Sequence, residues 1–245
     1  MAEIVGSDKY MNSDYVEYQR KYRKNIRESD KVTIELIKKN VLTREKAEDL
    51  SLLDIGCHNG NLLYHLKAAL PQIKMMGGDL FQGVIDECRA DPDLAGIDFD
   101  VMDVTDLRCE PVDIIVVSAV LARFSREEHK NIWQSFYDIL KPNGIVISFD
   151  WYNPFRQSLR IIEETETHPN GLILNFWSQE LVKDQLIEIG FVKYQFQMFE
   201  IPIDLELKDP SDPLYTHTRL TVDGNRLQFR GALYQPWCHL VAHKP

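Results

Sequence analysis

Short, almost continuously apolar runs alternate with longer helical patterns along this chain, and that alternation restricts its fold more than any other feature. Strands of a parallel sheet covered by helices on both faces read as continuous apolar runs, whereas half-exposed strands alternate polar and apolar residues. The sequence therefore predicts a Rossmann-like α/β fold with a doubly wound, mostly parallel sheet. The first five predicted strands span 51–55, 74–79, 97–103, 112–120 and 144–150.

Helical patterns fill the segments between and around these strands. Ser125 followed by Glu128 forms a capping box that predicts the start of the helix over 125–140. We expect further helices over 10–27, 30–41, 61–70, 82–89, 155–166 and 178–189. Two more strands are predicted over 192–201 and 237–242, and an Asp223-Gly224 turn between TRLTV and NRLQF predicts a small extra hairpin inside 202–235.

Charge and composition exclude several classes of partner. The chain has 28 Lys and Arg against 38 Asp and Glu, a formal charge of -10, which disfavours nucleic acid. The one basic cluster, 20–27, predicts a solvated helix face, with a local anion contact as the alternative. The longest apolar run is roughly half a membrane span, the N-terminus lacks a signal-peptide core, and no CxxC pair suggests a metal site. We expect a cytoplasmic protein without membrane or metal partners.

A glycine loop follows the first strand directly, in LLDIGCHNGNLL. Gly56 and Gly60 let the backbone approach a ligand and leave the first N–H groups of the next helix free, although an ordinary tight turn is the alternative. A dinucleotide fingerprint would be GxGxxG, but Asp54 occupies the place of its first glycine. Because a carboxylate there repels a pyrophosphate and suits an ammonium or sulfonium group, we expect a ligand with a cationic centre.

Two more acidic residues end the next two strands. Asp79 lies about twenty residues beyond the glycine loop, where a carboxylate accepts hydrogen bonds from ribose hydroxyls. Asp103 is placed to accept from an adenine amino group, with the Val104 N–H available to a ring nitrogen. Helix or turn capping is the alternative for both carboxylates. Three acids at the carboxyl ends of successive strands indicate a binding site at that edge of the sheet.

These motifs, in this order, resemble those of class I S-adenosylmethionine-dependent methyltransferases. LLDIGCHNG is similar to their first motif, GGDL to the ribose-binding strand end, DVMD to the adenine-binding strand end, and LKPNGIVISF to the turn and fifth strand. The resemblance covers about residues 30–200. It implies strand order 3-2-1-4-5-7-6 in a seven-stranded sheet whose last strand is antiparallel and is formed by QPWCHLVAHK.

The resemblance also implies an organisation and a set of cofactor contacts. We expect a single domain over 1–245, made of an N-terminal helical lid (1–45), a cofactor-binding core (46–200), a β insertion (201–236) and the last strand (237–245). The implied contacts to S-adenosylmethionine come from Gly56, Cys57 and Gly60 for methionine, Asp79 and Leu80 for ribose, Asp103 and Val104 for adenine, and Ser118 and Ala119 beside the sulfonium. Asp54 and His58 are further candidates by their place in the loop, with a solvent-facing side chain as an equal reading of His58. Tyr22 and Arg27 are candidates in the lid, with core packing as the alternative for the tyrosine face of that helix.

The acceptor side is less defined. Nucleic-acid branches of the family carry an Asn-Pro-Pro-aromatic signature that SFDWYNPF lacks, so a small molecule is expected. Arg123 stands where many small-molecule members have a His pair, and with Trp151 and Tyr152 it is a candidate for substrate binding. Candidate bases are His168, Asp150 and Tyr152, although an exposed loop histidine is an equal reading of His168.

The sequence thus predicts a methyltransferase that acts on an oxygen or nitrogen of a small molecule and releases S-adenosylhomocysteine. A methyltransferase-like binding or scaffold protein without catalysis is one alternative. An NAD(P)-dependent oxidoreductase is another, disfavoured by Asp54. The oligomeric state stays open, with a homodimer as one alternative.

Overall fold

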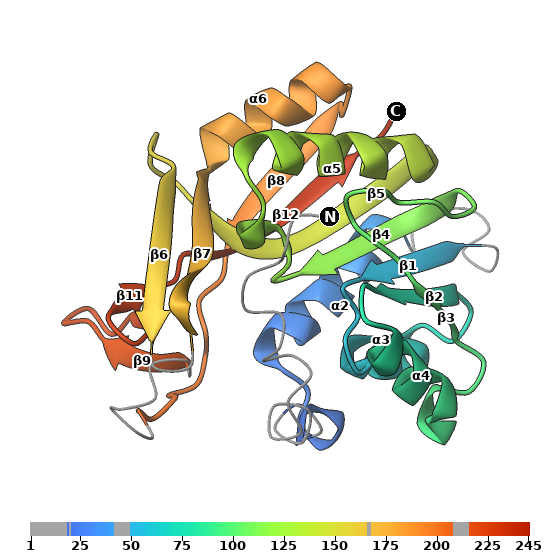
Figure 1. Cartoon of the computed structure of the whole chain (residues 1–245), viewed down its shortest axis with the longest axis horizontal. Helices are drawn as coiled ribbons and strands as arrows, with labels where there is room; N and C mark the ends of the chain where they lie inside the picture. Colours follow the sequence, from blue (N-terminus) through green and yellow to red (C-terminus); the bar gives the residue numbers. More distant parts are fainter. Residues whose placement is uncertain (1–18, 20, 42–49, 166–167, 208–215) are drawn as a thin grey trace.

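The main feature of the molecule is a mixed β-sheet with helices on both faces (Figure 1). The computed structural model describes residues 19, 21–41, 50–165, 168–207 and 216–245. Seven strands follow one another across the sheet in the order β3-β2-β1-β4-β5-β12-β8. They are β1 (Ser51–Ile55), β2 (Lys74–Asp79), β3 (Asp98–Val101), β4 (Val112–Ser118), β5 (Leu140–Asn153), β8 (Lys193–Met198) and β12 (Trp237–His243).

The direction of the strands matches the predicted topology. β1 to β5 pair in parallel, whereas β12 is antiparallel to both of its neighbours, β5 and β8. The predicted strand order, with the last strand inserted antiparallel beside the fifth, is confirmed. This order brings the carboxyl ends of β1, β2, β3 and β4 to the same edge of the sheet, where the predicted cofactor residues lie.

Two separate hydrophobic cores flank the sheet. The helices are α2 (Glu28–Val41), α3 (Asn61–Ala69), α4 (Gln82–Ala90), α5 (Arg126–Ile139) and α6 (Gln179–Ile189), with short 3-10 turns η3 (Pro92–Leu94) and η4 (Leu121–Arg123). α2, α3 and α4 pack on the face that carries Leu52, and α5 and α6 pack on the face that carries Leu53 (Figure 1). Successive strand residues point to opposite faces, so a strand buried on both sides is apolar at every position.

The predicted starts of two helices are confirmed. The capping box of Ser125 and Glu128 begins α5, and Ser178 caps α6. The predicted helix over 10–27 lies largely outside the described residues, of which 21–24 are helical. No helix within the described ranges is long and apolar enough to cross a lipid bilayer.

The helix predicted over 155–166 is wrong, because this segment forms a strand. β6 (Leu159–Thr165) pairs antiparallel with β7 (His168–Ser178), and β7 in turn pairs with the end of β5. The β-branched residues of LRIIEET fit a strand once a partner strand exists, and local propensity gives way to that pairing. His168 therefore opens the second strand of a hairpin and does not lie in a turn between two helices.

The predicted extra hairpin is confirmed and belongs to a second, three-stranded sheet. β9 (Thr216–Leu220) and β10 (Arg226–Arg230) pair antiparallel around the Asp223-Gly224 turn, and β11 (Leu233–Tyr234) adds a third strand. A largely buried ion pair of 2.7 Å joins Arg230 to Glu163 of β6. This small sheet lies beside the β6–β7 hairpin (Figure 1).

Candidate functional site

The glycine loop turns sharply at the carboxyl end of β1 and is tied to β2. The backbone N–H groups of Gly56 and Cys57 both donate to the Gly78 carbonyl, at 2.7 and 3.0 Å. Gly56 has φ 75°, and a Cβ added there would meet Val120 Cγ2 at 2.5 Å. A side chain at this position is therefore excluded both by the backbone conformation and by the segment that follows β4.

The loop ends in a helix start that no side chain caps among the residues the structure describes. Gly60, with φ 68°, occupies the N-cap of α3 and offers no side-chain hydrogen bond to the first turn. The first N–H groups of α3 are therefore left for another partner, and the positive end of the helix dipole lies there. This is the arrangement that accepts a carboxylate or other anionic group of a ligand.

The N-terminal segment lies directly against this loop through Arg23, a residue that sequence reasoning did not single out. Arg23 donates to the Asn61 side chain at 2.9 Å and to the Asn59 carbonyl at 2.7 Å, and it forms a 2.9 Å ion pair with Asp91. Asn61 in turn donates to the Gln19 carbonyl at 2.8 Å. Part of the predicted solvated basic face therefore clamps the glycine loop. The position of Arg23 within the basic cluster 20–27 gave no signal of this contact.

Asp79 occupies the end of β2, adjacent to the glycine loop. Its two oxygens accept hydrogen bonds from the backbone N–H groups of His58 at 2.9 Å and Phe81 at 3.2 Å. Each carboxylate oxygen has further acceptor capacity, so these bonds fix the side chain and still leave it able to bind hydroxyls. The alternative of a cap for α4 is only partly met, because the N-cap position is Phe81. Leu80 lies between the two.

Buried acidic groups gather beneath the loop. Asp54 is 3% exposed, and burial together with the charges of Asp30 and Asp79 raises its pKa to about 8. Asp30, at the start of α2, is also buried, and burial raises its pKa. Arg27 lies 3.6 Å from Asp30 and lowers the pKa of both carboxyls. The site as it stands carries more acidic than basic groups, which favours a cationic ligand.

Tyr22 and Arg27, the two predicted lid residues, lie together beside this acidic group. The Arg27 guanidinium stands 4.1 Å from the centroid of the Tyr22 ring. His65 of α3 contacts the Tyr22 carbonyl at 2.7 Å. Both residues therefore belong to the segment that borders the glycine loop. His58 has φ 46°, and burial lowers the pKa of its imidazole.

Asp103 and Val104 follow β3, next to Asp79. The Met102 N–H donates to the Asp79 carbonyl at 2.9 Å, which ties the two strand ends together. One oxygen of Asp103 accepts from both the N–H and the hydroxyl of Thr105, so part of this carboxylate serves a local turn. In the part of the chain that the structure describes, the Val104 N–H donates to no other group.

Ser118 and Ala119 end β4 beside the glycine loop. Ala119 has φ 58°, and its N–H donates to the Phe149 carbonyl of β5 at 2.8 Å. The Ser118 hydroxyl is buried without a hydrogen-bond partner among the described residues. A buried hydroxyl without a partner at a strand end is unusual and indicates a position where a ligand supplies the missing bond.

Asp150 and Tyr152 of β5 point into the molecule. Asp150 is buried and accepts from the N–H groups of Leu121, Ala122 and Trp151 at 2.6, 3.2 and 2.8 Å, while burial raises its pKa to about 6. Tyr152 is completely buried, and its hydroxyl lies 2.8 Å from the Ser148 hydroxyl. The structure places both as supports for the strand end.

Trp151 lies on the opposite face of β5 from these two residues, in a group of stacked rings that we call the aromatic wall. It consists of Phe149, Trp151, Phe176 and Trp237. Phe149 stacks on Trp237 at 4.7 Å, and Trp151 stacks on Phe176 at 4.8 Å. The Trp151 indole N–H is buried and meets no acceptor among the residues described. The wall adjoins Ala119 through Phe149.

Arg123 and His168 lie on different sides of this region. Arg123 is largely buried in η4, and burial first, then the neighbouring Arg230, lower its pKa to about 10. Asp150 and Glu163 oppose that shift. His168 is paired with Thr165 at the far end of the hairpin, seven residues before Asn175, whose amide contacts the Ala122 carbonyl. At strand spacing that separation is about 23 Å, so His168 is not brought to the other candidates.

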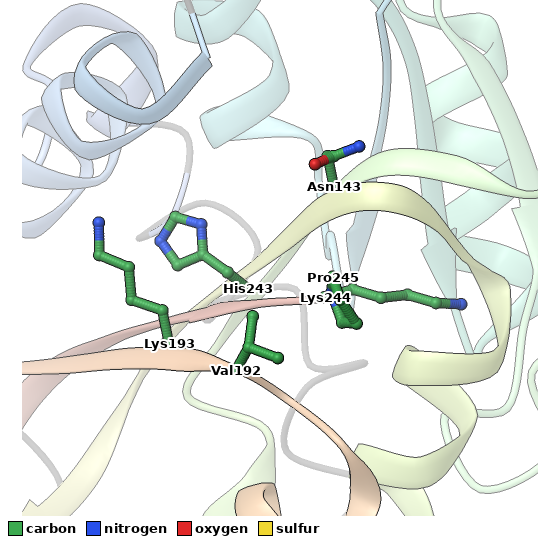
Figure 2. Close-up of a pocket in the computed structure, with 6 residues that line it drawn as sticks. All are labelled: Asn143, Val192, Lys193, His243, Lys244 and Pro245. Atoms are coloured by element: carbon green, nitrogen blue, oxygen red, sulfur yellow. The ribbon is translucent and has the colours of Figure 1, made fainter.

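A hollow lies on another part of the molecule, away from the residues described so far (Figure 2). Its volume is about 460 Å³, and it is lined by Asn143, Val192, Lys193, His243, Lys244 and Pro245. Lys193 begins β8 and His243 ends β12, so this hollow is at the edge of the sheet where β5 begins, opposite the glycine loop. It does not belong to the predicted site.

Comparison with known proteins finds a family match in the part of the chain that contains the glycine loop. Residues 52–144 match the family model described as a methyltransferase domain. Among curated protein sequences, none matches the chain. The matched segment contains the glycine loop, Asp79, Asp103 and the end of β4.

Several solved structures have the same fold. A S-adenosylmethionine-dependent methyltransferase from Methanosarcina mazei is 17% identical with a TM-score of 0.55, covering 80% of this chain and 93% of that protein. The YcgJ protein from Bacillus subtilis is 14% identical with a TM-score of 0.57, covering 86% and 97%. Human N-acetylserotonin methyltransferase, solved with S-adenosylmethionine, is 14% identical with a TM-score of 0.59, covering 100% and 60%. Likeness at these identities establishes the fold alone.

Proposed function

We propose that this chain, which carries a class I S-adenosylmethionine-dependent methyltransferase domain, transfers a methyl group from S-adenosylmethionine to an oxygen or nitrogen of a small molecule. The observation that carries the proposal is the glycine loop between Asp54 and Asp79, with no room for a side chain at Gly56 and an uncapped helix start at Gly60. We propose that the whole chain, including the insertion 201–236, forms one functional unit.

The residues at the carboxyl edge of the sheet fit S-adenosylmethionine. The free N–H groups at the start of α3 suit the carboxylate of its methionine part, and Asp79 has acceptor capacity for ribose hydroxyls. The unused Val104 N–H suits a ring nitrogen of adenine. The buried Ser118 hydroxyl, which lacks a partner among the described residues, lies where the family resemblance puts the sulfonium.

The charge of the site supports a cationic cofactor over a dinucleotide. Asp30 and Asp79 lie close enough to Asp54 to raise its pKa, and Arg27 opposes that shift. A pyrophosphate placed on this loop would meet that negative charge, whereas ammonium and sulfonium groups are attracted by it. This argues against the NAD(P)-dependent alternative. The cofactor, when bound, supplies a methyl group on a positively charged sulfur, which is a good leaving group.

We propose that the acceptor lies against the aromatic wall. Ala119 joins the cofactor side to Phe149, so the wall begins one strand away from the position proposed for the sulfonium. The Trp151 N–H, buried without an acceptor among the described residues, offers a hydrogen bond to a polar atom of the substrate. Stacked rings favour a flat, partly aromatic acceptor. Arg123 and the ion pair of Arg230 with Glu163 close the side formed by the insertion.

Alignment of the two reactants is the main catalytic contribution we propose. Holding reacting groups in line contributes up to about 7 to 11 kcal/mol to lowering a barrier. Asp150 and Tyr152, two of the candidate bases, already direct their oxygens to partners within the fold. His168 remains a candidate only if the hairpin end approaches the acceptor during turnover.

The test is production of S-adenosylhomocysteine from S-adenosylmethionine with a panel of phenols, aromatic acids and aromatic amines. We expect turnover with at least one flat aromatic acceptor and none without an acceptor. A chain that binds S-adenosylmethionine but turns over no member of the panel would support the scaffold alternative instead.

A further inference from the structure

A second, smaller hollow lies where α5 begins, on the side of β7 away from the aromatic wall. Its volume is about 210 Å³, and it is lined by Ser125, Arg126, Ser158, Leu159, Arg160, Asn175 and Trp177. Because side chains alternate along a strand, Asn175 and Trp177 face this hollow while Phe176 between them joins the aromatic wall. Pockets for whole drug-sized ligands are about 300 to 1,000 Å³, so this one suits a single small group.

The hollow carries unbalanced positive charge. Neither Arg126 nor Arg160 forms an ion pair with another residue in the described part of the chain. Glu128, held at the helix start by a 2.8 Å hydrogen bond from the Ser125 N–H, is attracted to Arg160 and offsets part of this charge, so that two guanidinium groups stand against one carboxylate. Two available guanidinium groups beside a helix start are exceptional in a chain with a formal charge of -10.

Two further groups of the hollow, on Trp177 and Ser158, can donate hydrogen bonds. Trp177 is 6% exposed, and its indole N–H is buried without an acceptor among the described residues, although a buried indole N–H normally has one. The Ser158 hydroxyl accepts from the Ser178 N–H at 3.2 Å, which leaves its own hydrogen to be donated. The Asn175 amide nitrogen is already engaged with the carbonyls of Ala122 and Phe124.

We propose that this hollow binds a tetrahedral oxyanion of the phosphate type, held by the guanidinium groups of Arg126 and Arg160 and by hydrogen bonds from Trp177 and Ser158. The four donors come from the start of α5 (Arg126), the residue before β6 (Ser158), β6 (Arg160) and β7 (Trp177). A tetrahedral anion presents oxygens in several directions, whereas a carboxylate presents two in one plane. Arginine forks match such oxygens in pairs. The site is separate from the glycine loop and does not rest on the proposed methyl transfer.

The site is tested by titrating the ¹⁵N-labelled chain with inorganic phosphate while chloride keeps the ionic strength constant, because screening alone changes exposed charges. The chain has four tryptophans, and a Trp177→Phe variant assigns the Trp177 indole signal. We expect that signal to shift saturably. Arg126→Gln and Arg160→Gln should each weaken phosphate binding at least tenfold. Arg156→Gln, which removes a neighbouring exposed arginine that does not line the hollow, should leave it unchanged.

Two further arms identify the source of the anion. A phosphate monoester that binds more tightly than inorganic phosphate indicates a phosphate group on a larger ligand, and equal affinity indicates the free ion. Acetate should bind at least tenfold more weakly than phosphate. Equal phosphate affinity in the native chain and in a folded Arg126→Gln/Arg160→Gln variant would overturn the site, as would the lack of any saturable shift of the Trp177 signal.

Discussion

Gly56→Ala is the substitution whose effect follows most directly from the geometry of the glycine loop. An alanine at φ 75° is in the left-handed region, which costs about 1–2 kcal/mol. Its Cβ would also meet Val120 Cγ2 at 2.5 Å, and overpacking of this kind costs about 1–3 kcal/mol. We expect the free energy of unfolding to fall by about 2–5 kcal/mol, the sum of the two effects.

Gly96 provides the matched control. It has φ 86°, and a Cβ added there meets no atom within 4 Å, so Gly96→Ala should cost only the backbone effect of about 1–2 kcal/mol. Urea unfolding at 25 °C measures both variants, and in a domain of this size each kcal/mol also lowers Tm by about 2–4 °C.

The steric effect is separated from the backbone effect by a double-mutant cycle. Val120→Ala removes the methyl group that meets the new Cβ, so Gly56→Ala should cost about 1–3 kcal/mol less in that background. If Gly56→Ala is no more destabilising than Gly96→Ala, or if Val120→Ala gives no relief, the close approach of the segment after β4 to the glycine loop is refuted.

Three further predictions concern binding and turnover. Asp79→Ala should weaken binding of S-adenosylhomocysteine at least tenfold by calorimetry, since hydrogen bonds to a charged group contribute about 1.5–3 kcal/mol each, whereas the exposed Asp100→Ala should not; equal affinities would refute the ribose role. Burial raises the pKa of Asp54 to about 8, so this group stabilises the ligand-free protein at low pH, and that contribution is lost as pH rises through 8. Because a cationic ligand favours the ionised carboxylate, the affinity for S-adenosylmethionine should fall by up to tenfold for each pH unit below 8, and binding should release a proton that the buffer takes up. A pH-independent affinity would contradict this. Replacing 218–230 with a glycine-serine linker should reduce turnover while cofactor affinity stays within a few fold; full turnover in that variant would refute a role of the insertion in acceptor binding. His168→Ala should leave turnover within a few fold, and a large loss of turnover would show that the hairpin end takes part in the reaction.

The central sheet was predictable because its strands are buried on both faces. Continuous apolar runs such as the one ending in Val117 identify doubly covered strands, and the antiparallel position of β12 followed from the family resemblance. The β6–β7 hairpin was not predictable in the same way. LRIIEET has charges and β-branched residues in a mixture that fits either a helix or a strand, and only the pairing with β7 decides it.

The candidate site shows the same division between local and long-range signals. Asp54, Gly56 and Asp79 stand at strand ends that the sequence marks clearly. Arg23 gave no such signal, since its contacts are with Asn59 and Asn61, 36 and 38 residues away. The role of Tyr152 was equally hidden, because residues that follow a strand read as accessible until the strand is seen to continue to Asn153.

Separate calorimetric titrations of the native chain with S-adenosylhomocysteine, with NAD and with NADP test the central claim most directly, because the glycine loop is a candidate site for either kind of ligand. The account predicts saturable binding of S-adenosylhomocysteine at one site per chain and no heat of binding with either dinucleotide. Binding of NAD or NADP by a chain that does not bind S-adenosylhomocysteine would contradict it.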